Sequence, residues 1–91
     1  MSIVRIPPPL RPSVNGERQV EASGATVREV LDNLTSRFPA LRQQVFEGDD
    51  IAPFINVFVE SEDVRTLDGL DTSVADGNTV MLLPAMAGGS A

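Results

Sequence analysis

The part of the sequence best suited to chemistry is its C-terminal end, Pro84-Ala85-Met86-Ala87-Gly88-Gly89-Ser90-Ala91. Its residues are small, and Gly88-Gly89 is the pair that best passes through a channel with no room for side chains. Fully extended, the five residues from Ala85 to Gly89 reach roughly 17 Å, at about 3.3–3.6 Å per residue. Such a tail can place a terminal carboxylate in the active site of another protein. The alternative is a frayed chain end, because termini are often poorly ordered.

The rest of the composition offers little for catalysis. The 91-residue chain has no Cys and no His, and all of its basic residues are Arg, so it also has no Lys. Thiolate nucleophiles, disulfides and thiolate metal sites are excluded, as are imidazole general bases and Schiff-base chemistry. Polymers linked through lysine side chains of this chain are excluded as well. We therefore expect a protein that is not itself an enzyme.

The charge balance limits the classes of partner. A net charge of −6 argues against nucleic acid and anionic membranes, whose phosphates attract basic surfaces. It suits an encounter with a protein that has a positive cleft. No apolar run is long enough to span a membrane, and the N-terminus lacks the basic region of a signal peptide. We expect a cytoplasmic protein.

The first half of the chain predicts two strands and a helix. A strand over 2–6 precedes Pro7-Pro8-Pro9, which we expect to form an extended, rigid loop; a polyproline ligand is the alternative. A second strand over 18–22 should run antiparallel to the first. Thr26 and Glu29 form a capping box that opens a helix. The apolar spacing predicts one buried helical face, and Pro39 ends the helix or starts a short second turn that carries Leu41 and Val45 inward.

The second half predicts further strands. Residues 47–50 read as a solvated loop, and residues 54–59 alternate in the manner of a strand. A polar turn over 60–63 leads into a short strand at 64–65. Leu67, Leu70 and Val74 are expected to pack inward, and Asp76-Gly77-Asn78 is a turn before the last strand at 79–83.

This order, ββαββ, indicates an α+β protein with the β-grasp (ubiquitin-like) arrangement: a mixed sheet, one main helix packed across it, and a flexible C-terminal tail. The first and last strands should lie parallel at the centre of the sheet. Their consecutive apolar residues suggest that both faces of these strands are buried. We expect one domain over 1–84 and a tail over 85–91.

Several segments carry a family resemblance. The fold order with a terminal Gly-Gly resembles the ubiquitin-like sulfur carriers of thiamin and molybdopterin synthesis (the MoaD/ThiS type). More closely, the chain resembles the actinobacterial carriers of cysteine synthesis, of the CysO type. It rests on these segments in this order: Phe54-Ile55-Asn56-Val57-Phe58-Val59, Glu62-Asp63-Val64-Arg65, Asp76-Gly77 and Leu83-Pro84-Ala85-Met86-Ala87-Gly88-Gly89.

The resemblance implies a mechanism. An E1-like enzyme joins the terminal Gly89 to AMP from ATP, and sulfide or a persulfide displaces AMP to leave a thiocarboxylate. The sulfur then passes to a synthase, such as a PLP-dependent cysteine synthase. The carrier itself binds no cofactor and no metal. Its functional residues are Gly89 with Ala87 and Gly88 in the tail, and Phe58, Arg65 and Met86 are candidates for partner binding.

The chain departs from the family pattern at its end, because Ser90-Ala91 follows Gly89. Some relatives carry a short extension that a JAMM-type zinc metalloprotease removes. We expect Ser90-Ala91 to be such a mask, with cleavage between Gly89 and Ser90.

Other side chains have plainer alternatives. Phe58 either points from the open sheet face toward a partner or packs under the loop at 47–50, and Phe54 more simply packs. Arg65 could bind a partner's carboxylate, although a surface ion pair is the simpler expectation. The acidic groups at 49–50 and 60–63 lack the ligand pattern of an EF-hand and read as solvated turns.

Two other functions remain open. The chain could be the small, tightly bound subunit of a synthase of the molybdopterin type, or a non-covalent ubiquitin-like interaction module with an idle tail.

Overall fold

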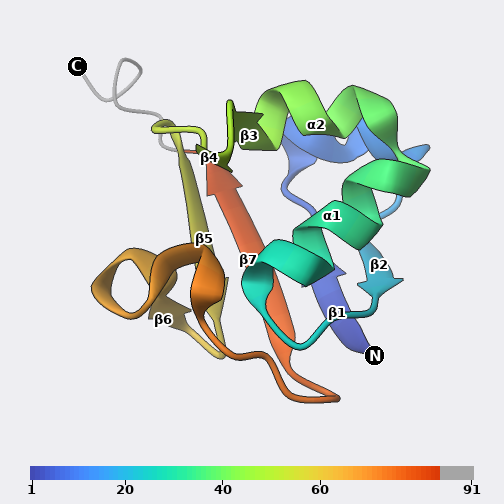
Figure 1. The fold of residues 1–91 in the computed structure, drawn as a ribbon. Helices are drawn as coiled ribbons and strands as arrows, with labels where there is room; N and C mark the ends of the chain where they lie inside the picture. Colours follow the sequence, from blue (N-terminus) through green and yellow to red (C-terminus); the bar gives the residue numbers. More distant parts are fainter. Residues whose placement is uncertain (85–91) are drawn as a thin grey trace.

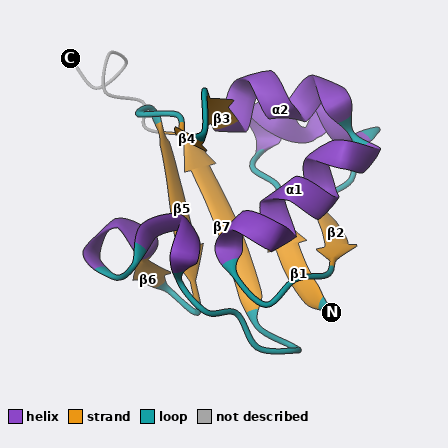
Figure 2. Cartoon of the chain, in the orientation of Figure 1, coloured by secondary structure: helices purple, strands orange, loops and turns teal. Residues whose placement is uncertain are grey.

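The computed structural model describes residues 1–84 (Figure 1). Within them, a five-stranded mixed sheet carries both α-helices on one face, and 3-10 helices occupy several connections (Figure 2). The elements are β1 (Ser2–Arg5), η1 (Pro8–Val14), β2 (Gln19–Ala22), α1 (Val27–Arg37), α2 (Pro39–Val45), β3 (Phe46–Glu47), β4 (Asp50–Ile51), β5 (Ile55–Val59), β6 (Glu62–Asp63), η2 (Val64–Thr66), η3 (Gly69–Asp71) and β7 (Thr79–Pro84).

The sheet has the strand order β2-β1-β7-β5-β6. The first and last strands, β1 and β7, run parallel at its centre, with Val4 opposite Val80. Strand β2 is antiparallel to β1, and β5 is antiparallel to β7. These pairings confirm the predicted β-grasp arrangement.

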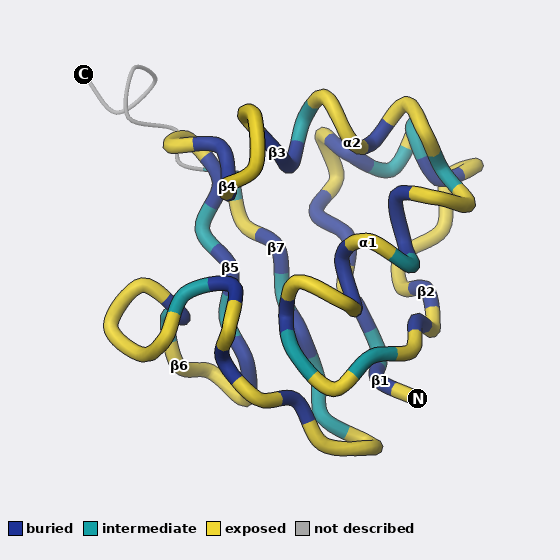
Figure 3. Tube along the Cα trace, in the orientation of Figure 1, coloured by how far each residue is buried: buried dark blue, intermediate teal, exposed yellow. Residues whose placement is uncertain are grey.

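The core lies between this sheet and the helices (Figure 3). The predicted helical spacing is confirmed, because α1 and α2 turn their apolar side chains toward the sheet. The fully buried helical residues are Val27, Val30, Leu31, Leu34, Leu41 and Val45. Burial of this kind contributes about 1.5–3 kcal/mol for each large aliphatic side chain.

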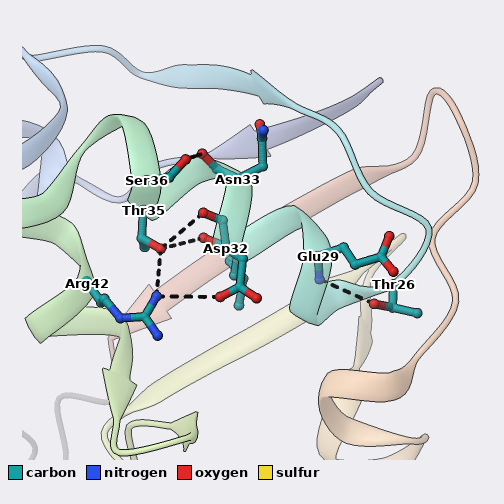
Figure 4. A network of polar contacts seen from close by, with 8 residues as sticks. Thr26, Glu29, Asp32, Asn33, Thr35, Ser36 and Arg42 are labelled. Carbon is teal, nitrogen blue, oxygen red and sulfur yellow. Dashed lines mark hydrogen bonds and ion pairs between the residues drawn. The ribbon is translucent and has the colours of Figure 1, made fainter.

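Helix α1 begins at the predicted cap. The hydroxyl of Thr26 accepts a hydrogen bond from the Glu29 N–H at 3.3 Å (Figure 4). The Glu29 carboxylate accepts from the N–H of Ala25 at 2.9 Å, one residue before the cap. The Thr26 half of the predicted box is therefore confirmed, whereas Glu29 bonds the residue before the cap and not Thr26 itself.

Polar contacts also join the two helices. The guanidinium of Arg42 on α2 donates to the Thr35 hydroxyl at 3.3 Å and lies 3.5 Å from the Asp32 carboxylate, both on α1 (Figure 4). The same guanidinium lies 4.8 Å from the centre of the Phe46 ring. Arg42 thus spans α1, α2 and the start of the β3–β4 hairpin.

The prediction of an extended proline loop is wrong. Pro8 and Pro9 form the first turn of η1, which buries Leu10 and Val14 against the core. Proline suits a first helical turn because its φ is already close to the helical value and no N–H is needed there. These residues therefore do not form a polyproline II segment.

Two expected boundaries also differ. The loop at 47–50 is the tip of a short hairpin, in which Phe46 pairs with Ile51 and Glu47 with Asp50. The short strand predicted at 64–65 lies instead at Glu62–Asp63. Positive φ values at Glu60 and Ser61 make a tight two-residue turn. Strand β6 therefore pairs with β5 immediately after this turn. Asp63 then caps η2 by accepting from the Arg65 N–H at 2.9 Å.

The connection between β2 and α1 depends on Gly24. A Cβ at this position would lie 2.6 Å from the Val30 nitrogen and 2.7 Å from the Glu29 Cβ. Because backbone atoms of α1 would have to move, we expect Gly24→Ala to lower the free energy of unfolding by about 3 kcal/mol. Urea unfolding measures this loss.

The matched control is Gly16→Ala, where a Cβ would meet no atom within 4 Å and only the positive φ opposes the change. We expect a loss of about 1 kcal/mol at Gly16. Equal losses at the two glycines would contradict a close approach between Gly24 and the helix.

Candidate functional site

The sheet face opposite the helices carries three outward-facing apolar side chains near the end of β7. Phe58 on β5 lies directly opposite Met81 on β7, and Leu83 follows Met81 on the same face of the strand. Leu83 is 40% exposed, while Phe58 and Met81 are half-buried. Directly opposite side chains in an antiparallel pair contact one another. We call Phe58, Met81 and Leu83 the open-face patch.

This patch corrects the prediction that the central strands are buried on both faces. The inward residues Val4, Val80 and Leu82 are fully buried. The outward residues Met81 and Leu83 are not, since no helix of residues 1–84 covers their side of the sheet (Figure 2). The consecutive apolar residues of β7 therefore combine one core face with one partly exposed face.

Two of the apolar side chains that were expected to pack are exposed in the structure. Phe58 points away from the helices, beside Met81 and Asp63, as one of its two interpretations required. Phe54, which was expected to pack, is 49% exposed in the turn before β5. Leu67, also expected to pack, is 44% exposed just after η2. Leu70 and Val74 are buried as predicted.

Arg65 makes hydrogen bonds within the fold. Its guanidinium donates to the Asn56 side-chain oxygen at 2.9 Å and to the Ala52 carbonyl at 3.0 Å. Among residues 1–84, no carboxylate lies within ion-pairing distance of it, so the simple expectation of a surface ion pair is wrong. Asn56 lies opposite Leu83, which places Arg65 close to the patch.

We expect Arg65→Ala to lower the free energy of unfolding by about 1–2 kcal/mol, because it removes two hydrogen bonds. Arg65→Lys should not restore the loss, since an ammonium lacks the planar fork that reaches both acceptors. Urea unfolding tests this against Arg18→Ala, the same change at an exposed arginine with no side-chain hydrogen bond among the described residues. Equal stability of the Arg65→Ala and Arg18→Ala variants would contradict a structural role for Arg65.

The residues with predicted roles in the chemistry lie after residue 84, where the described part of the chain ends. Met86, Ala87, Gly88, Gly89 and Ser90 all lie outside residues 1–84, so their predicted roles stay predictions. The last described residue, Pro84, pairs with Ile55 on β5. The chain therefore continues toward Gly89 from the edge of the open-face patch.

Sequence reasoning missed a groove next to this point. A groove of about 260 Å³ lies between β7, the end of β1 and the start of η1. Its lining combines apolar side chains with Arg5 and Arg11. The apolar outward residues of β7 signal one wall, but the other wall depends on the turn of η1, which the sequence pattern did not predict.

Other kinds of site have no support in the described part of the chain. Residues 1–84 contain no group of three or more acidic side chains placed to hold a metal ion. Among the same residues, no helix is both long and apolar enough to cross a membrane.

Comparison with known proteins places this geometry in a family. The ThiS family model matches residues 4–89. The sulfur carrier protein CysO of Mycobacterium tuberculosis is 38% identical over 89 residues, covering 94% of this chain and 96% of the relative.

Two solved structures show the same fold. A chain in the crystal structure of the Amycolatopsis orientalis BexX/CysO complex superposes with a TM-score of 0.91 at 42% identity, covering 96% of this chain and 98% of that one. The small archaeal modifier protein 1 of Methanosarcina acetivorans superposes with a TM-score of 0.86 at 29% identity, covering 94% and 93%. With its β-grasp sheet and a family match over nearly its whole length, the chain belongs to the ThiS family.

Proposed function

We propose that the protein is a sulfur carrier whose working terminus is the carboxylate of Gly89. The observation that carries this proposal is the extent of the family match, which runs from residue 4 to Gly89 and leaves Ser90 and Ala91 outside it. The similarity to sulfur carrier proteins named CysO supports the same function.

The chemistry takes place on partner enzymes. A carboxylate oxygen of Gly89 attacks the α-phosphorus of ATP, pyrophosphate leaves, and an acyl adenylate forms. A sulfide then attacks the acyl carbon, AMP leaves, and the terminus becomes a thiocarboxylate. Both steps belong to an E1-like activating enzyme, and ATP is its substrate. The carrier needs no resident cofactor or metal.

The fold supplies a docking surface and the starting point of the tail. The open-face patch offers partly exposed apolar area, which is the kind of surface that a protein partner covers. Pro84 lies at the edge of this patch, so a partner seated on Phe58 and Met81 is well placed to receive the following residues. Arg65 holds Asn56 beside Leu83 and thereby shapes this edge. Met86 would enter the partner with the tail.

Release of Gly89 requires one hydrolytic step. Water adds across the Gly89–Ser90 peptide bond, which frees the Gly89 carboxylate and the dipeptide Ser90-Ala91. We assign this step to a JAMM-type zinc metalloprotease, and the full-length chain is then an inactive precursor.

The sulfur acceptor is a biosynthetic synthase. The thiocarboxylate sulfur is a nucleophile, and it suits attack on an electrophilic intermediate of a PLP-dependent cysteine synthase or of an enzyme that makes a thio-metabolite. Similarity to a chain in a BexX/CysO complex supports a carrier that assembles with a partner protein.

A deletion tests the proposal in the native host. Loss of Gly89-Ser90-Ala91 should abolish the function, as judged by growth or metabolite formation that depends on this gene. A wild-type phenotype would overturn the proposal in favour of a non-covalent interaction module. Purification of a stable complex with a synthase in the absence of ATP would overturn it in favour of a synthase subunit.

A further inference from the structure

The groove beside the open-face patch has an unusual charge for this protein. The chain carries a net charge of −6, yet both charged residues that line the groove are arginines, Arg5 and Arg11. No carboxylate of residues 1–84 contributes to its lining. The groove is therefore a locally positive site on an acidic protein.

The two arginines are held differently. Arg11 donates from Nε to the Ile6 carbonyl at 3.1 Å, which fixes the plane of its guanidinium at the start of η1. Arg5, the last residue of β1, is exposed and has no side-chain hydrogen bond or ion pair within residues 1–84. Both can still donate to an incoming carboxylate, and a guanidinium suits a carboxylate because it offers paired N–H groups.

The remaining wall of the groove is apolar. It is formed by Met81, Leu82 and Leu83 of β7 together with Ile6, Pro7 and Pro8. Leu82 and Ile6 are buried, while Leu83 and Pro8 are exposed. A ligand that fits must therefore bring an apolar side chain and a negative charge close together.

The position of the groove, beside the end of β7, indicates which protein would cover it. Leu83 belongs both to the groove and to the last residues of β7, and the described chain ends one residue later at Pro84. An enzyme that takes residues 85–89 into its active site must lie over this end of the sheet. Charge complementarity then requires that the part of it which faces the groove be acidic.

We propose that this groove binds a segment of the activating enzyme in which an aliphatic or aromatic side chain lies next to one or more carboxylates. The apolar side chain packs against Met81 and Leu83, and the carboxylates pair with Arg5 and Arg11. This inference rests on the proposed function, because it names the surface by which the enzyme that adenylates Gly89 holds the carrier.

Steady-state kinetics test the charge requirement. The substrate is the chain ending at Gly89, and the assay is ATP–pyrophosphate exchange by the purified activating enzyme of the same organism. Reversal of a charge at the rim of an interface should raise KM for the carrier about tenfold in Arg5→Glu, with kcat unchanged. Arg5→Gln should lie between Arg5→Glu and wild type. Raising the salt concentration should increase the KM of wild type more than that of Arg5→Glu.

The matched control is Arg18→Glu. Arg18 is also exposed, has no side-chain hydrogen bond within the described residues and lies outside the groove. It makes the same change in net charge. Thermal unfolding of each variant establishes that it is folded. An equal rise in KM for Arg5→Glu and Arg18→Glu would overturn the proposal, because it would show a general effect of charge.

Cross-linking identifies the occupant. The chain has no Cys, so Pro8→Cys provides a single thiol at the groove for a photoreactive maleimide. Mass spectrometry of the complex with the purified enzyme should place the cross-link on a peptide with adjacent apolar and acidic residues. A cross-linked peptide without carboxylates, a cross-link to the bound nucleotide, or one to the carrier's own residues would each overturn the proposal.

The same assay separates this inference from the function on which it depends. If the wild-type chain ending at Gly89 supports exchange but Arg5→Glu has the KM of wild type, the groove proposal alone fails. If the wild-type chain supports no exchange, the proposed function fails and the groove proposal with it.

Discussion

The chain ending at Gly89 is expected to be charged with sulfur at least about 100-fold faster than the full-length chain, by the same activating enzyme with ATP and sulfide. The two extra residues move the carboxylate by roughly 7 Å, at about 3.3–3.6 Å per residue. They also place the methyl group of Ala91 where the family presents glycine. Adenylation requires the carboxylate oxygen in line with the α-phosphorus, so a displacement of this size removes productive geometry.

Intact mass spectrometry over a time course measures the charging rate. A chain ending at Gly88 is the matched control for length, because it moves the carboxylate in the opposite direction and keeps a terminal glycine. We expect it to be charged as poorly as the full-length chain. Equal rates for the full-length chain and the form ending at Gly89 would contradict the idea that Ser90-Ala91 is a mask.

The second prediction with a large effect concerns a substitution in the open-face patch. Met81→Glu is expected to weaken binding of the activating enzyme about 100-fold, in the range of hot-spot residues at the centre of an interface. Met81 lies between Arg5 of β1 and Phe58 of β5 in the sheet register. A carboxylate there would have to lose its water when a partner covers the patch.

Isothermal titration of the activating enzyme with each variant measures the loss. Gln43→Glu is the matched control, because it adds the same charge at an exposed position of α2, on the other side of the sheet from the patch. We expect its affinity to stay within about threefold of wild type, as for rim positions. If Met81→Glu binds as tightly as Gln43→Glu, the open-face patch is not the docking surface.

Most of the fold could be predicted from local patterns. The Thr26 cap, the apolar spacing of α1 and the two-residue alternation of β5 each act within one element, and the structure confirms them. The parallel pairing of β1 and β7 followed from the order of the elements. The failures came from local turn geometry. The turn at Glu60 and Ser61 was read as longer than it is, and the proline segment was read as extended although proline also fits a first helical turn.

The candidate site was predictable only in part. The glycine pair was visible because its chemistry depends on residue type and on distance from the chain end. Phe58 was visible because strand alternation separates the two faces of β5. Met81 was hidden inside an apolar run that equally suits a strand buried on both faces. The sequence could not show that Arg5 and Arg11 line the same groove, because the groove exists only once η1 folds beside β7.

The most direct test of the sulfur-carrier proposal is the intact mass of the protein purified from its native host. The account predicts a species that ends at Gly89, with one oxygen of the terminal carboxylate replaced by sulfur. A population found entirely at full length through Ala91, and unchanged after incubation with host extract, ATP and sulfide, would contradict it. That result would favour a non-covalent ubiquitin-like interaction module.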